Sequence, residues 1–198
     1  GDLKADAPAY YFLDLNAEDV ASFRSTANGI IPDAKLAEAP MLRGRIVALK
    51  GVPVDKIDVG PDYRWVLNGD RGLTYTETLP EASEVVEGEW WPKDYSGPPL
   101  VSFDVEAARG LGLNIGDAIT VNILGRNVDA KIASLRKIDW ESLAINFVMV
   151  FTPNTLDGAP HRTLVTLELP KNVDSSTEAK LIQALADKFP LITAIKVG

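Results

Sequence analysis

The feature that most constrains the fold is a strand, helix, strand succession that occurs at both ends of the chain. Residues Tyr10–Leu15 are mostly aromatic and aliphatic, a composition typical of a buried strand. Asn16, with an acid three residues later at Asp19, favours the start of a helix, which we expect to close near Gly29. Residues Met41–Leu49 alternate as a second strand. The first part of the chain therefore predicts a β-α-β unit.

The far end repeats this order. Residues Thr163–Leu169 form a strand-like run that Pro170 stops, and Ser175 with Glu178 matches a capping box at the start of a helix. Residues Leu191–Val197 then favour a closing strand. The expected buried stripe of the helix comprises Ala179, Ile182, Ala186 and Phe189, flanked by Leu181 and Leu185.

Together the two ends predict an α+β fold of the ferredoxin-like split βαβ type, with a long insertion between the halves. In that topology the first and last strands are antiparallel neighbours, so both chain ends leave the sheet at the same edge. We therefore expect Asp6 and Val197 to lie on one face. Such an arrangement suits a module held between two flanking elements, although neighbouring termini are common in domains generally.

The middle of the chain predicts a smaller, mostly β insert at residues 88–156, leaving 1–87 and 157–198 as one discontinuous α/β subdomain. Residues Trp65–Thr76 carry turn-forming residues between apolar stretches and favour a hairpin. A short helix is expected at Val105–Leu111. The expected strands of the insert are Leu100–Phe103, Ala118–Leu124, Val128–Leu135 and Asn146–Phe151.

Composition excludes several classes of function. The chain has no cysteine and one histidine, so disulfides and thiolate metal sites are excluded and catalytic zinc is not expected. A net charge of -8 repels phosphate backbones, so we expect no nucleic-acid partner. No run of apolar residues reaches the roughly 18–20 that a membrane-spanning helix requires.

The glycines at 110, 112, 116 and 125 raise the question of a nucleotide loop. A dinucleotide fingerprint follows a strand and opens a helix, whereas these glycines follow the helical residues Val105–Arg109 and precede a strand. There is also no Walker A sequence. We interpret Gly110, Gly112 and Gly116 as helix-ending and turn residues, and expect no nucleotide, metal or other cofactor in this chain.

Two longer stretches, Gly88–Pro92 (GEWWP) and Leu100–Val121 (LVSFDVEAARGLGLNIGDAITV), followed by Trp140–Phe147, resemble the extracytoplasmic domain of MacB/FtsX-like ABC transporter permeases. The nearest likeness is to the YbbP-like permeases associated with lysophospholipase, and residues Arg64–Tyr75 strengthen it. The resemblance covers roughly residues 8–197. It implies a porter-like subdomain made from both ends and a sabre-like β-rich insert.

The resemblance also implies a function. The chain is expected to be the periplasmic segment of an inner-membrane permease that couples ATP-driven motion of membrane helices to an extracytoplasmic change, with a lipidic or hydrophobic substrate. The implied partners are a cytoplasmic ATPase subunit, a second permease copy and a periplasmic lysophospholipase-like enzyme. ATP would bind only to the ATPase subunit, so the chain is not expected to be an enzyme.

Two other classes of function stay open. One is a non-catalytic binding module that recruits a periplasmic enzyme or lipid, and the other is a hydrolase that uses His161 in the loop before the strand at 163–169. No G-x-S-x-G elbow supports the hydrolase. The candidate contact residues are aromatic side chains near the expected ends of the insert, which could bind a partner or substrate, or join the subdomains. They are Trp90, Trp91, Tyr95 and Trp140.

Overall fold

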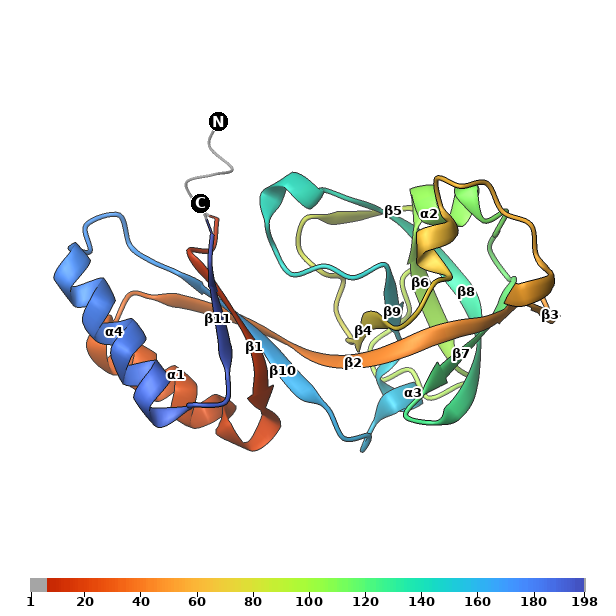
Figure 1. Ribbon diagram of the computed structural model, residues 1–198. Helices are drawn as coiled ribbons and strands as arrows, with labels where there is room; N and C mark the ends of the chain where they lie inside the picture. Colours follow the sequence, from red (N-terminus) through yellow and green to blue (C-terminus); the bar gives the residue numbers. More distant parts are fainter. Residues whose placement is uncertain (1–6, 198) are drawn as a thin grey trace. The chain divides into compact units, whose positions relative to one another are not determined.

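The computed structural model describes residues 7–197, which fold as a mixed α/β protein of two compact units (Figure 1). Of the described residues, unit 1 contains 7–40, Glu141–Ile145 and 160–197, and unit 2 contains Met41–Trp140 and Asn146–Ala159. Among residues 7–197 no helix combines the length and the apolar character needed to cross a membrane.

Unit 1 contains a sheet in the order β11-β1-β10-β2, in which β1 pairs antiparallel with both β10 and β11. The strands are β1 (Tyr10–Asn16), the first part of β2 (Lys35–Leu49), β10 (Arg162–Glu168) and β11 (Thr193–Lys196). The helices are a 3-10 turn (Ala17–Asp19), α1 (Val20–Ile30) and α4 (Ser175–Lys188). The expected strand–helix–strand order at each end of the chain is therefore confirmed.

Helices α1 and α4 lie side by side over one face of this sheet (Figure 1). Tyr10, Phe12 and Leu15 of β1 pack into the core of unit 1, with a register shift of the strand between Phe12 and Leu15. Phe12 packs edge-on against Phe23 of α1 with ring centroids 5.0 Å apart. The apolar core of unit 1 consists of Tyr10, Phe12, Leu15, Phe23, Ala27, Ile31, Ala34, Val165, Leu167, Leu181, Leu185 and Phe189.

The first and last strands are direct neighbours. Tyr10 of β1 lies opposite Lys196 of β11 in antiparallel register, and the backbone N–H of Val197 donates to the carbonyl oxygen of Ala9 at 2.8 Å. The expectation that the two ends of the described chain leave the sheet at the same edge is confirmed. Asp6, expected on the same face as Val197, lies outside the described residues.

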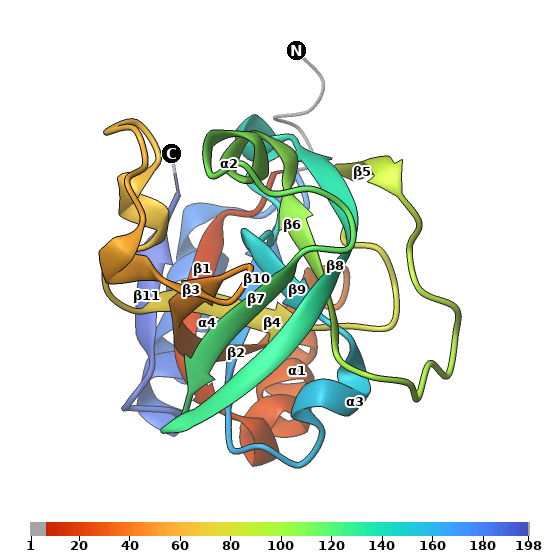
Figure 2. The same cartoon turned by 90° about the vertical axis from the view of Figure 1, so that its right-hand side faces the viewer.

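Unit 2 is built on a closed ring of strand pairings, β2-β7-β8-β6-β9-β4-β2. Figure 2 shows β7 and β8 side by side as an antiparallel pair. The strands of unit 2 besides β2 are β3 (Val52–Pro53), β4 (Arg71–Tyr75), β5 (Ser83–Gly88), β6 (Leu100–Asp104), β7 (Ala118–Ile123), β8 (Arg126–Ile138) and β9 (Met149–Phe151). Its helices are α2 (Val105–Gly110), α3 (Pro153–Leu156) and 3-10 turns at Val54–Lys56, Arg64–Val66 and Trp140–Ser142, the last of which runs into unit 1.

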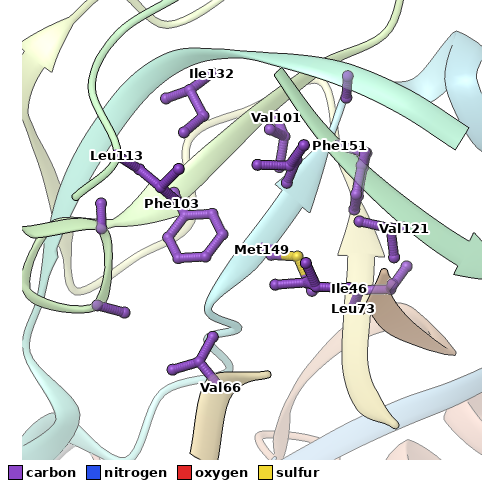
Figure 3. Packing of buried hydrophobic residues seen from close by; sticks show 14 of the residues in the cluster. Ile46, Val66, Leu73, Val101, Phe103, Leu113, Val121, Ile132, Met149 and Phe151 are labelled. Carbon is purple, nitrogen blue, oxygen red and sulfur yellow. The ribbon is translucent and has the colours of Figure 1, made fainter. Parts of the chain in front are cut away.

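Side chains of this ring fill its centre. Phe103, Met149 and Leu73 come from β6, β9 and β4 and converge with residues of the other strands (Figure 3). All three are fully buried. Because each ring strand is paired on both sides over part of its length, alternate residues can point inward without leaving an open edge beside this core.

The glycines after α2 have the roles that we predicted. Gly110 ends α2, and the N–H of Leu113 reaches back to the carbonyl of Ala108 at 2.8 Å, a contact typical of a helix C-terminus. Gly112 and Gly116 adopt φ of 70° and 89°, the left-handed region that glycine enters without steric cost.

Several local predictions are wrong. No hairpin spans Trp65–Thr76, because Trp65 lies in a 3-10 turn and β4 pairs with β2. Asn16 makes no side-chain cap. At α4 the cap is Asp174, which accepts the N–H of Thr177, rather than Ser175. In the expected stripe of α4, Leu181 and Leu185 are buried, whereas Ala179 and Ala186 are exposed.

The first boundary between the units lies after residue 40, whereas the sequence placed it after residue 87. The reason is the length of β2, which has 15 residues rather than the nine expected. Its second part, from Met41, pairs with β4 and β7 and so contributes to the ring of unit 2. A single long strand shared by two units leaves no linker in the sequence to mark where one ends.

Candidate functional site

The structure brings together two of the four candidate aromatic residues, Trp90 and Trp91, in the loop after β5. Their ring centroids lie 4.1 Å apart. The indole N–H of Trp90 donates to the carbonyl of Glu77 at 2.8 Å, and that of Trp91 donates to the carbonyl of Thr76 at 3.0 Å. Trp91 is only 4% exposed. These contacts tie the loop after β5 to the segment after β4, all within unit 2.

Tyr95 lies further along the same loop and makes a local contact. Its hydroxyl donates to the carbonyl of Pro98 at 2.7 Å, closing a short turn around Gly97. A Cβ at Gly97 would lie 2.5 Å from that hydroxyl, so a larger residue there would displace the Tyr95 side chain. Tyr95 is partly buried and orders its own loop.

Trp140 differs from the other three candidates because it is 52% exposed. It begins the 3-10 turn Trp140–Ser142 that follows β8. A large, half-exposed indole costs free energy in water and gains it when a partner covers the ring. Trp140 is therefore the candidate whose surroundings best fit contact with another molecule.

Trp65 is a second exposed indole, which was not among the candidates predicted from the sequence. It is 43% exposed, and the guanidinium of Arg71 lies 4.7 Å from the centre of its ring, a cation–π geometry. Arg71 also donates to the carbonyl of Trp65. Within residues 7–197 the Nε of Arg71 is buried and has no hydrogen-bond partner. The sequence did not predict this site, because the hairpin expected at Trp65–Thr76 placed Trp65 inside a strand.

The most deeply buried charge in unit 2 is Arg136 of β8. Its Nε donates to Ser102 Oγ at 2.8 Å, and one terminal nitrogen donates to the carbonyls of Phe147 and Val148 at 2.8 and 3.2 Å. Burial lowers the pKa of Arg136 to about 10, and the nearby carboxylate of Asp104 opposes that shift. The arginine therefore still carries its charge at neutral pH. Its hydrogen bonds to Phe147 and Val148 hold in place the segment that leads into β9.

The residue on which the hydrolase hypothesis depends is His161. His161 lies in the loop before β10, as the sequence predicted, and is partly buried. Within the described residues there is no group of three or more His, Asp or Glu side chains arranged to hold a metal ion.

The comparisons with known proteins identify a relative. The chain is 29% identical, over 198 residues and 99% of its length, to "Uncharacterized ABC transporter permease YbbP" of Escherichia coli (strain K12). The chain is homologous to an ABC transporter permease. It spans 22% of the length of that relative. The resemblance predicted from residues 64–75, 88–92, 100–121 and 140–147 is thus confirmed. The expectation that the chain is not an enzyme agrees with a permease as its relative.

Among solved structures, the periplasmic region of MacB from Actinobacillus actinomycetemcomitans is similar at 14% identity, with 98% of this chain and 92% of that chain covered and a TM-score of 0.46. No family model matches the chain.

Proposed function

We propose that this chain is the periplasmic domain of an ABC transporter permease subunit and that it couples ATP-driven motion of membrane helices to a change outside the membrane. The observation that supports this most is the pairing of β1 with β11, which brings Ala9 and Val197 within one hydrogen bond of each other. Two membrane helices, one joined to the chain before β1 and the other to the chain after β11, would move unit 1 as one body. The relationship to YbbP over 99% of the chain supports the same assignment.

We further infer that unit 1 is a ferredoxin-like, porter-like subdomain. The strand order β11-β1-β10-β2, with α1 after β1 and α4 after β10, supports this assignment. Unit 2, with its ring of strands, corresponds in this proposal to the sabre-like part. A subdomain of this kind is rigid because both helices pack on one face of the sheet, so motion at its chain ends reaches the whole unit.

The partners in this proposal are a cytoplasmic ATPase subunit, which would supply the energy, and a second permease copy. A lipidic or hydrophobic substrate and a periplasmic lysophospholipase-like enzyme complete it. The ATPase subunit would hold the nucleotide. The exposed rings of Trp140 and Trp65 are the groups that we propose for contact with substrate or partner. Trp90 and Trp91 join two segments of unit 2, and Tyr95 orders its own loop.

Two tests, one on the complete gene and one on its product, check the assignment. The gene sequence on each side of this segment should encode a membrane helix. The chain has no cysteine, so Ser96→Cys, at an exposed position, gives this segment a single label site. A maleimide that cannot cross membranes should label it in intact cells. Absence of flanking helices, or labelling only after lysis, would contradict the proposal.

The exposed tryptophans support a second candidate, a non-catalytic module that recruits a lipid or a periplasmic enzyme. The indole emission of Trp140 and Trp65 should shift to shorter wavelength when lysophosphatidylcholine micelles cover them. The variant Trp140→Phe/Trp65→Phe is the matched control, because only the inward tryptophans remain. Equal shifts in both proteins would argue against recruitment of lipid through these rings.

A further inference from the structure

Three side chains from three different elements of unit 1 meet where the chain enters β1 and leaves β11. The hydroxyl of Tyr10 donates to Glu178 Oε2 at 2.6 Å. The Nζ of Lys196 lies 3.4 Å from the same carboxylate oxygen and 6.0 Å from the centre of the Tyr10 ring. One oxygen of Glu178, on α4, therefore joins the first strand, the last strand and a helix.

The register of the strands explains why these side chains meet. The N–H of Val197 donates to the carbonyl of Ala9 at 2.8 Å, so this backbone bond of the ladder joins the residues that flank the pair Tyr10 and Lys196. Pairs alternate along such a ladder, which makes Tyr10 and Lys196 a non-hydrogen-bonded pair, the kind whose side chains lie closest. The aliphatic stem of Lys196 can then cover the ring while its ammonium group reaches Glu178.

Besides its pairing with β1 and the contacts of Lys196, strand β11 makes few interactions that would hold it in the sheet. All four of its residues are exposed, and it lies at the end of the strand order of unit 1. A short edge strand without buried side chains opens at low free energy. The backbone ladder to β1 and the contacts of Lys196 thus carry a large share of what keeps β11 in place.

The contact between Tyr10 and Glu178 is the stronger half of this group. Lys196 has a side chain 68% exposed, so its ion pair with Glu178 is screened by water. Tyr10 is 7% exposed, and its hydrogen bond to a charged acceptor is short. Burial, the hydrogen bond and the charge of Glu178 raise the pKa of Tyr10 to about 12, so the hydroxyl keeps its proton and remains a donor.

We propose that Tyr10, Glu178 and Lys196 form a clasp that holds the end of β11 against β1 and passes tension on the chain ends into α4. Ala9 and Val197 leave the sheet at the same end of an antiparallel pair. A force that separates them loads the ladder one hydrogen bond at a time, beginning beside the clasp. The transmission of tension by the clasp rests on the proposed function, whereas the stabilisation of β11 by the clasp does not depend on it.

Amide hydrogen exchange on the 198-residue chain tests the clasp. Glu178→Ala and Tyr10→Phe should each raise the exchange rate of the Val197 amide about tenfold, since each removes a hydrogen bond to a charged group. The amide of Val165, in the central strand β10, should be unaffected. The matched control is Asp187→Asn, which removes another α4 carboxylate, one that accepts a hydrogen bond from Gln183. If both clasp variants left Val197 within about twofold of the parent rate, the clasp would be overturned.

A double variant and a force measurement complete the test. Because the two groups act through one contact, Glu178→Ala/Tyr10→Phe should open β11 less than the two single effects multiplied. If Glu178→Ala unfolds unit 1, Tyr10→Phe still tests the clasp because the buried ring is retained. With handles at residues 7 and 197, the clasp variants should lose β11 at a lower force than the control, and equal forces would overturn the mechanical role. A gene without flanking membrane helices would remove the proposed function but leave these results intact.

Discussion

The Nε of Arg136 lies 2.8 Å from the Oγ of Ser102, and neither side chain is accessible to solvent. Ser102 Oγ also accepts a hydrogen bond from Ser134 Oγ at 2.7 Å. A guanidinium buried among hydroxyls and carbonyls is stable only while its donors are satisfied, because an unpaired charge or carbonyl in the interior costs several kcal/mol. This group is therefore a polar centre on which the local structure of unit 2 depends.

Replacement of Arg136 should be severely destabilising. Arg136→Ala leaves the carbonyl of Phe147 without its donor and creates a cavity, so the free energy of unfolding should fall by about 3–5 kcal/mol. Urea denaturation measures the loss. Arg126→Ala, at an exposed position of the same strand, should change it by less than about 0.5 kcal/mol. A similar effect of both variants would show that the buried network contributes little.

Two glycines with nearly the same backbone conformation should respond differently to alanine. Gly88 has φ of 73°, and a Cβ there would lie 2.1 Å from the carbonyl oxygen of Ala133. Gly112 has φ of 70°, with nothing within 4 Å of its Cβ position. Gly112→Ala should cost about 1–2 kcal/mol from backbone strain alone. Gly88→Ala should cost more than about 3 kcal/mol, because backbone atoms must also move. Thermal unfolding of the two variants checks the order, and equal losses would contradict it.

The sequence predicted best where periodicity and local chemistry agree. The aromatic and aliphatic run Tyr10–Leu15 predicts a buried strand, and the structure buries Tyr10, Phe12 and Leu15. The helical spacing of Leu181 and Leu185 predicts a buried side of α4, and both side chains are buried. The glycines after α2 were interpreted correctly because a left-handed turn leaves few alternatives to glycine. The pairing of the first and last strands followed from the order of elements.

The failures have a common physical cause, which is that partners distant in the sequence decide the outcome. Glu178 matches a capping box but instead accepts from Tyr10, 168 residues away. Trp65 looks like a strand residue, yet Arg71 and the 3-10 turn fix it outside any strand. The exposure of Trp140 and the burial of Trp91 could not be predicted either, because both lie in irregular segments whose burial depends on tertiary packing.

Two helix caps should respond to pH in opposite directions. Hydrogen bonds from the Thr177 backbone N–H and from the Thr177 and Ser176 hydroxyls lower the pKa of Asp174, the cap of α4. Its folded pKa is below the unfolded one, so its stabilisation is present above the unfolded pKa and is lost as pH falls through the folded pKa. Burial raises the pKa of Asp104, the cap of α2, more than its hydrogen bond from Ala107 lowers it. For Asp104 the stabilisation is present below the unfolded pKa and is lost as pH rises through the folded pKa.

Asparagine variants across acidic pH measure this contrast, since asparagine keeps the cap acceptor and does not titrate. The stability advantage of the parent over Asp174→Asn should shrink as pH falls through the range in which carboxyl groups titrate. The advantage over Asp104→Asn should grow over the same range. Parallel trends for the two variants would show that burial does not dominate at Asp104.

The tryptophans allow a final prediction that separates stabilising residues from contact residues. Trp91→Ala removes a buried ring and its hydrogen bond to Thr76, so the free energy of unfolding should fall by about 3–5 kcal/mol. Trp140→Ala removes a ring that is 52% exposed, and stability should change by less than about 0.5 kcal/mol. Acrylamide should quench the emission of Trp140 and Trp65 more efficiently than that of Trp91. If Trp140→Ala instead destabilised the protein as much as Trp91→Ala, the ring would be a packing residue and no longer a candidate for contact with a partner.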